Sequence, residues 1–218
     1  MNKEIDTLIL LRHARSTANE SQLVNKTTPD HVIPLVRPES DPDAVNAGEK
    51  IAALGLRASE VCCWCSPYLR CRQTEAIVIP RAFATTAADV VRRESFLLRE
   101  QEFGDWDGLT DDEIAAADPI RSARYQRMTD ARGRFYFRLP NGESRADVVE
   151  RVSIFIGKLH RSRFRHHVIT SHGVTQRALR MSWFDRSVEW FEDEHNPKNA
   201  SVLVIRRGPD QRWSEQYL

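Results

Sequence analysis

Two histidines stand where an apolar run ends and a helix-like segment begins. His13 follows the run Leu8–Leu11, and His172 follows a shorter apolar pair. A strand that presents a polar residue at its carboxyl end, directly before a helix, is how open α/β sheets build their sites. Arg70 falls in a third turn of the same kind. Two histidines and an arginine brought together in this way predict chemistry on a phosphoryl group.

The predicted pocket carries positive charge and free backbone N–H groups. Arg12 and Arg70 lie in turns that open helices, and helix N-termini attract anions through unbonded N–H groups and the macrodipole. Glu100 and Glu102 follow another predicted strand and supply carboxyl groups suited to proton transfer. Either could be the proton donor, and the spacing to Gly104 favours Glu100.

Five short motifs follow one another along the chain in a fixed order. Together they resemble the histidine phosphatase superfamily, which includes the phosphoglycerate mutases, and they span residues 8 to about 205. The motifs are Arg-His-x-x-Ser-x-x-Asn at 12–19, Ser-Pro-Tyr-Leu-Arg at 66–70 followed by Thr74, Glu-x-x-Phe-Gly at 100–104, Gly-Glu-Ser at 142–144 and Ser-His-Gly at 171–173.

The resemblance implies a role for each matching residue. His13 would attack phosphorus and form a phosphohistidine intermediate. Arg12, Arg70 and His172 would bind the non-bridging oxygens and stabilise the charge of the transition state. Glu100 would protonate the leaving alkoxide and later deprotonate the hydrolytic water. No metal or cofactor is required, because protein cations stabilise that charge.

Further substrate contacts are expected around these residues. Asn19 would contact the same phosphate, while Ser16 is as well suited to cap the first helix as to contact substrate. The substrate-binding candidates are Asn19, Ser16, Gly173 and Gln101. Five residues are possible specificity residues, and a solvated surface position is favoured for each: Arg15, Gln22, Gln101, Arg121 and Arg124.

The chain departs from the family pattern at three places. Ala14 stands where glycine is usual, and a positive φ there would cost about 1 kcal/mol. Cys65 stands where a small polar residue is common, which we interpret as neutral packing. The phosphoglycerate mutases carry Glu-Arg-His-Tyr-Gly in the acid motif, whereas residues 100–104 read Glu-Gln-Glu-Phe-Gly. The Arg-His pair that would bind a carboxylate-bearing substrate is missing, which favours a phosphatase.

The predicted function is therefore a metal-independent phosphomonoesterase of the histidine acid type that acts on a small-molecule phosphate ester. Two alternatives stay open. The first is a mutase-type phosphotransferase primed by a bisphosphorylated sugar acid. The second is a regulatory protein that binds phosphate esters without turning them over.

Strand and helix patterns alternate along the chain and must position these residues. Apolar runs predict strands at 8–11, 61–65, 89–98, 168–170 and 201–205. Helices are expected from Asn46, with Glu49 completing a capping box, from Ser66-Pro67, and from Ser144. This alternation predicts an α/β/α sandwich around a mainly parallel sheet, similar to that of the phosphoglycerate mutases. We expect a single domain over 1–218, a long loop at 20–45 and a helical insertion around 103–142.

The bulk composition suits a globular protein. The chain has 218 residues, a net charge of +1 and 41% hydrophobic residues, which gives no electrostatic case for nucleic acid or membrane as a partner. Only five of the 32 basic residues are lysine, and arginine suits an anionic substrate, although genomic bias explains this as well. Four cysteines within ten residues, with no apolar leader or membrane span, indicate reduced thiols and a cytoplasmic protein. The oligomeric state stays open.

Overall fold

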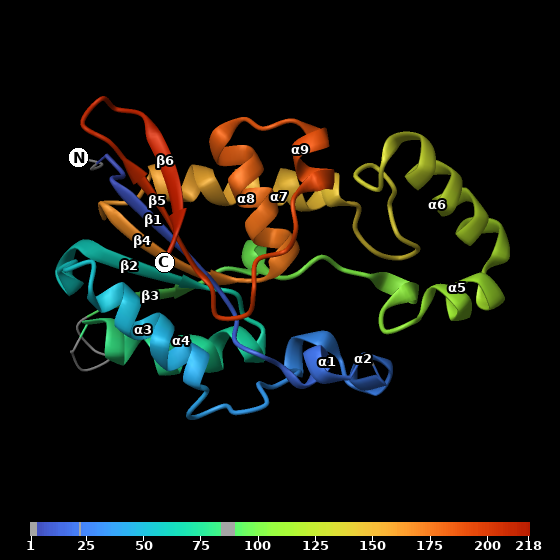
Figure 1. Ribbon diagram of the computed structural model, residues 1–218, viewed down its shortest axis with the longest axis horizontal. Coiled ribbons are helices and arrows are strands. Elements are labelled where there is room, and N and C mark those ends of the chain that lie inside the picture. The colour runs from blue at the N-terminus through green and yellow to red at the C-terminus, as the bar shows by residue number, and fades with distance from the viewer. Residues whose placement is uncertain (1–3, 22, 84–89) are drawn as a thin grey trace.

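The computed structural model describes residues 4–21, 23–83 and 90–218 and contains one six-stranded sheet (Figure 1). The strand order is β3-β2-β4-β1-β5-β6. The first four are parallel to one another, β5 pairs antiparallel with β1, and β6 pairs antiparallel with β5. The prediction of a mainly parallel sheet is confirmed. The strands are β1 Thr7–Arg12, β2 Val61–Cys65, β3 Val91–Glu94, β4 His166–Ser171, β5 Val202–Arg207 and β6 Trp213–Tyr217.

Helices cover both faces of this sheet, as predicted (Figure 1). Side chains alternate along a strand, so β1 sends Ile9 and Leu11 into the core shared with α3 and α4. Leu8 and Leu10 enter the opposite core, shared with α7 and α8. The helices are α1 Thr17–Glu20, α2 Leu23–Thr27, α3 Pro42–Ala52, α4 Leu69–Phe83, α5 Asp111–Ala117, α6 Pro119–Arg132, α7 Arg145–His160, α8 Gly173–Phe184 and α9 Val188–Asp193.

Two predicted helix starts are corrected by the structure. Helix α3 begins at Pro42 rather than at Asn46, because the Asp41 carboxylate accepts hydrogen bonds from two backbone N–H groups of the first turn. Helix α4 begins at Leu69, so Ser66 is not its N-cap. The Ser144 prediction is confirmed, with a capping box that opens α7.

The strand predictions differ from the structure at two places. The strand predicted at 89–98 is shorter in the structure, where β3 covers Val91–Glu94. Phe96–Leu98 form the short 3-10 helix η3, and residue 89 lies outside the described residues. Strand β6 was not predicted, because its alternation of Trp, Ser, Glu, Gln and Tyr is mostly polar, as suits a sheet edge. No helix in the described residues is long and apolar enough to cross a membrane.

The segments that were predicted as a loop and an insertion carry short helices. Residues 20–45 contain α2 and the 3-10 helix η1, Asp30–Val32. Helices α5 and α6 lie to one side of the sheet and its covering helices (Figure 1). Helix α6 contributes Tyr125 to an aromatic cluster with Trp106 and Phe137, with ring centroids 4.9 to 5.8 Å apart.

Candidate active site

The carboxyl ends of three parallel strands bring the predicted residues together. The backbone N–H of His13 donates to Ser171 O at 3.0 Å, and that of Ser66 donates to Thr170 O at 2.9 Å. The rings of His13 and His172 consequently lie next to each other in the site, with centroids 5.2 Å apart, an angle of 58° between the ring planes and both side chains buried. Adjacency of the two histidines therefore follows from the pairing of β1 with β4.

The His13 ring is prepared to act as a nucleophile. Its Nδ1 lies 2.8 Å from Ala14 O, a carbonyl that can only accept, so Nδ1 carries the proton and Nε2 keeps its lone pair. Burial, followed by the positive charges of Arg70 and Arg12, lowers the pKa of His13 well below 6.5. The imidazole is neutral at pH 7 and can attack an electrophile through Nε2.

The turn after His13 is fixed by two polar side chains. Thr74 Oγ1 accepts from the Ala14 N–H at 2.9 Å. Asn199 Nδ2 donates to His13 O and to Asn19 Oδ1, each at 3.1 Å. Ala14 is fully buried and is not among the described residues with positive φ, so its methyl group causes no strain. Asn199 was not predicted, because it lies after the last motif and no local pattern marks it.

His172 is the N-cap residue of α8 and is held from the opposite side by α4 and the turn before it. Its Nε2 lies 2.8 Å from Ser66 Oγ and 3.4 Å from Cys71 Sγ. Burial, then the charge of Arg70, lowers the pKa of His172 well below 6.5. A Cβ on the next residue, Gly173, would lie 2.8 Å from Asn196 Cγ, so a larger residue there would require the Asn196 side chain to shift.

Two arginines reach the site from β1 and α4. Arg70 is buried and donates to both carboxylate oxygens of Asp30, at 2.7 and 3.1 Å. Arg12 donates to Pro197 O, and its Nε has no acceptor among the described residues. Arg12 is half-buried, and a guanidinium with an unused N–H group fits an oxyanion ligand.

Of the two carboxyl candidates, Glu100 shares the site with these arginines. Burial raises the pKa of Glu100, opposed by the backbone N–H of Gln101 and by Arg70 and Arg12. Its carbonyl is held by Arg151 Nη2 at 3.0 Å. Glu102 is exposed and lies at the wall of an adjoining cavity. Glu100 therefore has both the position and the raised pKa of a general acid.

The remaining substrate-binding candidates are partly engaged by the protein itself. Asn19 Oδ1 accepts from the backbone and hydroxyl of Ser16, which closes the capping box of α1. The expected solvated position is wrong for Gln101, which is buried because its Nε2 donates to Glu143 O at 2.9 Å. Arg15 lies 3.6 Å from Glu20, and Gln22 lies outside the described residues.

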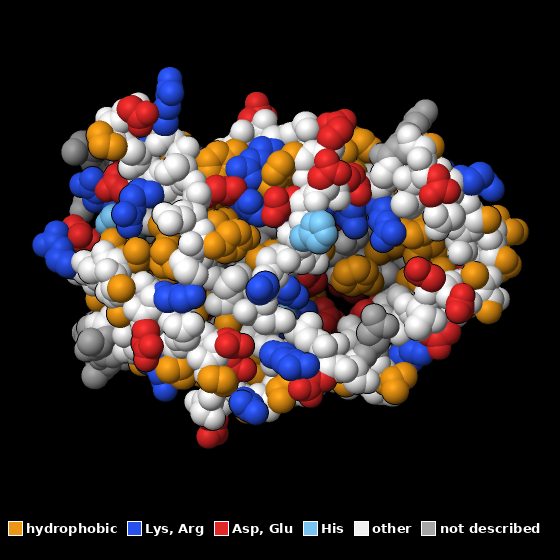
Figure 2. Space-filling model, in the orientation of Figure 1, with side chains coloured by type: hydrophobic (Ala, Val, Ile, Leu, Met, Phe, Trp, Pro, Cys, Tyr) orange, Lys and Arg blue, Asp and Glu red, His pale blue; other side chains and the backbone are white. Residues whose placement is uncertain are grey.

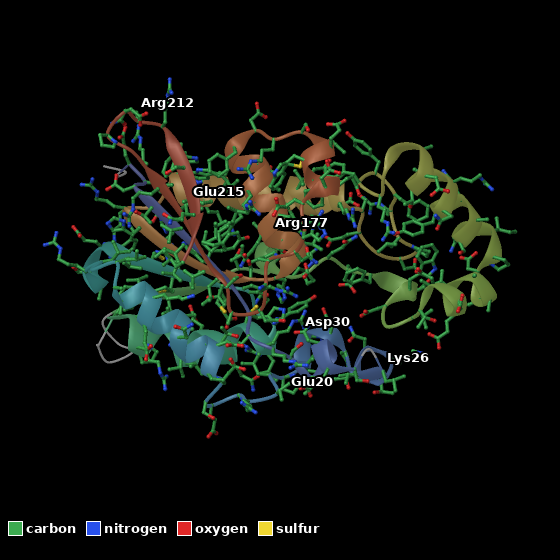
Figure 3. The ribbon with its side chains drawn as sticks, viewed as in Figure 1. Glu20, Lys26, Asp30, Arg177, Arg212 and Glu215 are labelled. Atoms are coloured by element: carbon green, nitrogen blue, oxygen red, sulfur yellow. The ribbon has the colours of Figure 1, made fainter. Side chains whose placement is uncertain are left out.

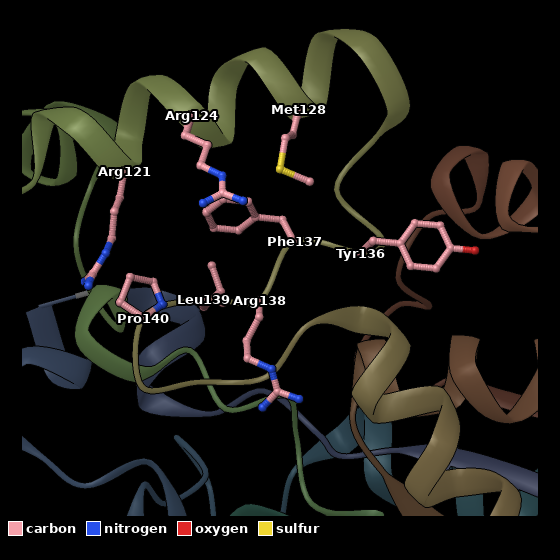
Figure 4. Close-up of a pocket in the computed structure, with 8 residues that line it drawn as sticks. All are labelled: Arg121, Arg124, Met128, Tyr136, Phe137, Arg138, Leu139 and Pro140. Atoms are coloured by element: carbon pink, nitrogen blue, oxygen red, sulfur yellow. The ribbon is translucent and has the colours of Figure 1, made fainter.

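One cavity is lined by partners of Arg70, and a second is lined by Arg121 and Arg124. One, of about 410 Å³, is lined by residues 25–31 with Tyr68, Glu102 and Asp107, and the surface is hollowed between α1, α5 and α9 (Figure 2). The other, of about 400 Å³, lies between α6 and residues 136–140 (Figure 4). Arg121 and Arg124, which line this second cavity, both belong to α6.

Within the described residues, no group of three or more His, Cys, Asp or Glu side chains could hold a metal ion. The four cysteines are buried and unpaired. Burial raises the pKa of Cys62 to about 11 and raises the pKa of Cys65 well above its usual value. The Cys62-x-x-Cys65 pair therefore lies inside the core as neutral thiols.

Sequence comparison identifies the family. The profile of the histidine phosphatase superfamily (branch 1) matches residues 8–217. The phosphoglycerate mutase-like protein AT74 of Arabidopsis thaliana is 35% identical over 95% of this chain, which spans 66% of that protein. The broad-range acid phosphatase DET1 of Saccharomyces cerevisiae is 33% identical over 50% of this chain and 32% of its own length.

Solved structures share the fold. A mycobacterial glucosyl-3-phosphoglycerate phosphatase matches with a TM-score of 0.72 and 22% identity, over 97% of each chain. YhfR of Bacillus stearothermophilus matches with the same score and identity, over 97% of this chain and 95% of its own. With the profile match over nearly the whole length, the chain belongs to the histidine phosphatase superfamily, branch 1.

Proposed function

We propose that the protein is a metal-independent phosphomonoesterase that works through a phosphohistidine on His13. The observation that carries this proposal is the state of the His13 ring. Its Nδ1 is bound to a carbonyl, its pKa is lowered, and two arginines supply positive charge to the same pocket. A neutral imidazole beside guanidinium groups is suited to attack a phosphate ester.

The proposed reaction has two displacements. His13 Nε2 forms a bond to phosphorus while the bond to the ester oxygen breaks, and the Glu100 carboxyl gives its proton to that leaving oxygen. Glu100, now ionised, takes a proton from water, whose oxygen attacks phosphorus while the bond from phosphorus to His13 Nε2 breaks. Inorganic phosphate is released, and the electron pair of that bond returns to Nε2. Arg12, Arg70 and His172 bind the non-bridging oxygens throughout, where losing one donor costs about 10²–10³ in rate.

The test is release of phosphate from a panel of phosphate esters with EDTA present, comparing the wild type with His13→Ala. We expect hydrolysis that survives chelation and falls by at least about 10³ in the variant. Phosphohistidine is labile in acid and stable in base. When the ester carries a labelled phosphoryl group, trapping at alkaline pH should therefore show the label on His13 in the wild type and none in His13→Ala. Full activity of a folded His13→Ala protein would refute the mechanism.

A mutase-type phosphotransferase is the second candidate, because AT74 bears a mutase-like name. The site favours hydrolysis, since Gln101 and Glu102 stand where the mutases carry Arg-His. The test is to compare transfer of a labelled phosphoryl group to a hydroxy acid with release of inorganic phosphate. Transfer indicates the phosphotransferase, and release indicates the phosphatase. Tight binding of esters with neither transfer nor release would instead indicate a regulatory binding protein.

The substrate is proposed to be a small-molecule phosphate ester met in the cytoplasm. We assign residues 1–218 to one catalytic domain, in which the segment 103–142 is an insertion. Asn19, Ser16, Gly173 and Gln101 are proposed to shape the phosphate site, the first through its amide and the others through the backbone turns that they hold.

A further inference from the structure

Arg70 is held by a carboxylate from a different part of the chain. Its Nη1 donates to Asp30 O and Asp30 Oδ1, both at 2.7 Å, and its Nη2 donates to Oδ2 at 3.1 Å. The Arg70 side chain is 6% exposed and that of Asp30 19%, so solvent screens the pair weakly. Asp30, labelled in Figure 3, begins η1, which contacts α4, the helix that carries Arg70.

The geometry of this pair decides which donors remain. A guanidinium has five N–H groups, and Asp30 takes both hydrogens of Nη1 and one of Nη2. Among the described residues, none accepts from Nε or from the second hydrogen of Nη2. These two donors form the side edge of the guanidinium, which matches two oxygens of a phosphoryl group as a fork. With Asp30 in place, a phosphate must bind Arg70 through that edge.

We infer that Asp30 is a positioning residue that orients Arg70 for phosphate binding, an inference that rests on the proposed function. Arg70 is clamped on three sides: by the Asp30 carboxylate, by the Asp30 carbonyl and by the Tyr68 ring, 5.0 Å from the guanidinium carbon. The guanidinium is therefore fixed before substrate arrives, and no side-chain ordering is needed on binding.

The same residue joins the phosphate site to the cavity beside it. Asp30 and Tyr68 both contact Arg70, and both line the cavity of about 410 Å³. A group bound there would press on the segment that orients Arg70. Asp30 thus links the short helices of residues 23–32 to the phosphate-binding arginine.

Removing the Asp30 charge has two effects on phosphate affinity, and they act in opposite directions. The measured direction therefore decides between them. By Coulomb's law alone, Asp30→Asn removes a negative charge near the site and should strengthen anion binding. By the positioning role, it frees the guanidinium to rotate and weakens binding. We expect inorganic phosphate, measured by calorimetry, to bind Asp30→Asn about tenfold more weakly than the wild type.

The design includes matched variants. Glu39→Gln makes the same charge change at an exposed position of the same segment and should leave phosphate affinity unchanged. Asp30→Glu keeps the charge but shifts the carboxylate, and should weaken phosphate binding several-fold. If Asp30→Asn fails to fold, Asp30→Glu tests the positioning role in its place. In an Arg70→Lys background, which has no fork, Asp30→Asn should have less than about a twofold effect.

The outcomes separate the inference from the proposed function. Unchanged or tighter phosphate binding by Asp30→Asn would overturn the positioning role, and so would an equal loss in the Arg70→Lys background. Neither measurement needs turnover. Hydrolysis that persists in His13→Ala would defeat the proposed mechanism while these binding results still decide the role of Asp30.

Discussion

At the scale of single residues, the site combines two opposite pKa shifts. Burial and neighbouring arginines lower the pKa of His13, whereas burial raises the pKa of Glu100. The nucleophile His13 stays unprotonated on Nε2, and the carboxyl of Glu100 keeps its proton. Both groups are therefore in their reactive forms over one range of pH. Environments that push two titratable groups apart in this way are typical of acid–base pairs in active sites.

These shifts predict an acidic pH optimum. Activity should fall as the pH rises through the raised pKa of Glu100, because the carboxylate can no longer donate a proton. On the acid side, His13 stays neutral until the pH is well below 6.5. Glu100→Gln should lower kcat for an alkyl phosphate by about 10²–10⁴ and remove the alkaline limb. Initial rates from pH 4 to 9 check this, with nitrophenyl phosphate as the control, because its good leaving group needs little protonation.

At the scale of elements, α7 holds the segment that carries Glu100. Arg151 is buried and donates to Leu97 O at 2.6 Å, to Glu100 O at 3.0 Å and to the Glu143 carboxylate. Glu143 in turn accepts from the backbone N–H of Glu102 at 3.1 Å. The acid segment is therefore fixed by a helix that supplies no proposed catalytic residue.

Arg151→Met tests this support. It leaves two buried carbonyls without a donor and should lower the free energy of unfolding by about 3 kcal/mol. It should also reduce kcat for alkyl esters, since Glu100 is displaced. Arg138→Met is the control, because the Arg138 side chain is 66% exposed where it pairs with Asp147, and its loss should cost less than about 1 kcal/mol. Denaturant unfolding measures the free energy of unfolding of both variants, and kinetics measures their kcat. Equal losses of unfolding free energy in the two variants would contradict the supporting role of Arg151.

At the scale of the whole molecule, the sheet buries a histidine that must stay neutral. Trp64 Nε1 donates to His167 Nδ1 at 3.2 Å, so protonation of that nitrogen would break the bond. Burial lowers the pKa of His167 to about 4. Since the unfolded chain binds this proton near pH 6.5 and the folded chain does not, stability should fall as the pH drops between these values.

The size of this effect follows from the two pKa values. Between pH 7 and pH 5 the wild type should lose about 2 kcal/mol through His167, while buried acids such as Glu75 change stability in the opposite direction. His167→Gln does not titrate, so the difference between the two proteins isolates this histidine. Urea unfolding at several pH values measures it, and parallel pH profiles for both proteins would contradict the prediction.

The sequence by itself determined the alternating sheet and the ends of its strands, and with them the grouping of His13, His172 and Arg70. These follow from local signals: apolar runs form buried strands, and parallel strands end at the same edge of a sheet. The five motifs and their order along the chain predicted the family, because short motifs can be recognised in the sequence alone. Strand β6 escaped prediction because its polar pattern lacks that signal, and α3 starts earlier because Asp41 and Pro42 made a better cap than Asn46.

Only the tertiary structure decided which neighbours hold the site residues. Asp30 lies 40 positions from Arg70, Asn199 lies 186 from His13, and Arg151 lies 51 from Glu100. No local pattern encodes such pairs, because they depend on how segments pack after the sheet has formed. The tautomer of His13 and the choice of Glu100 over Glu102 were decided in the same way. A carbonyl within hydrogen-bond distance and the depth of burial are properties of the folded chain alone.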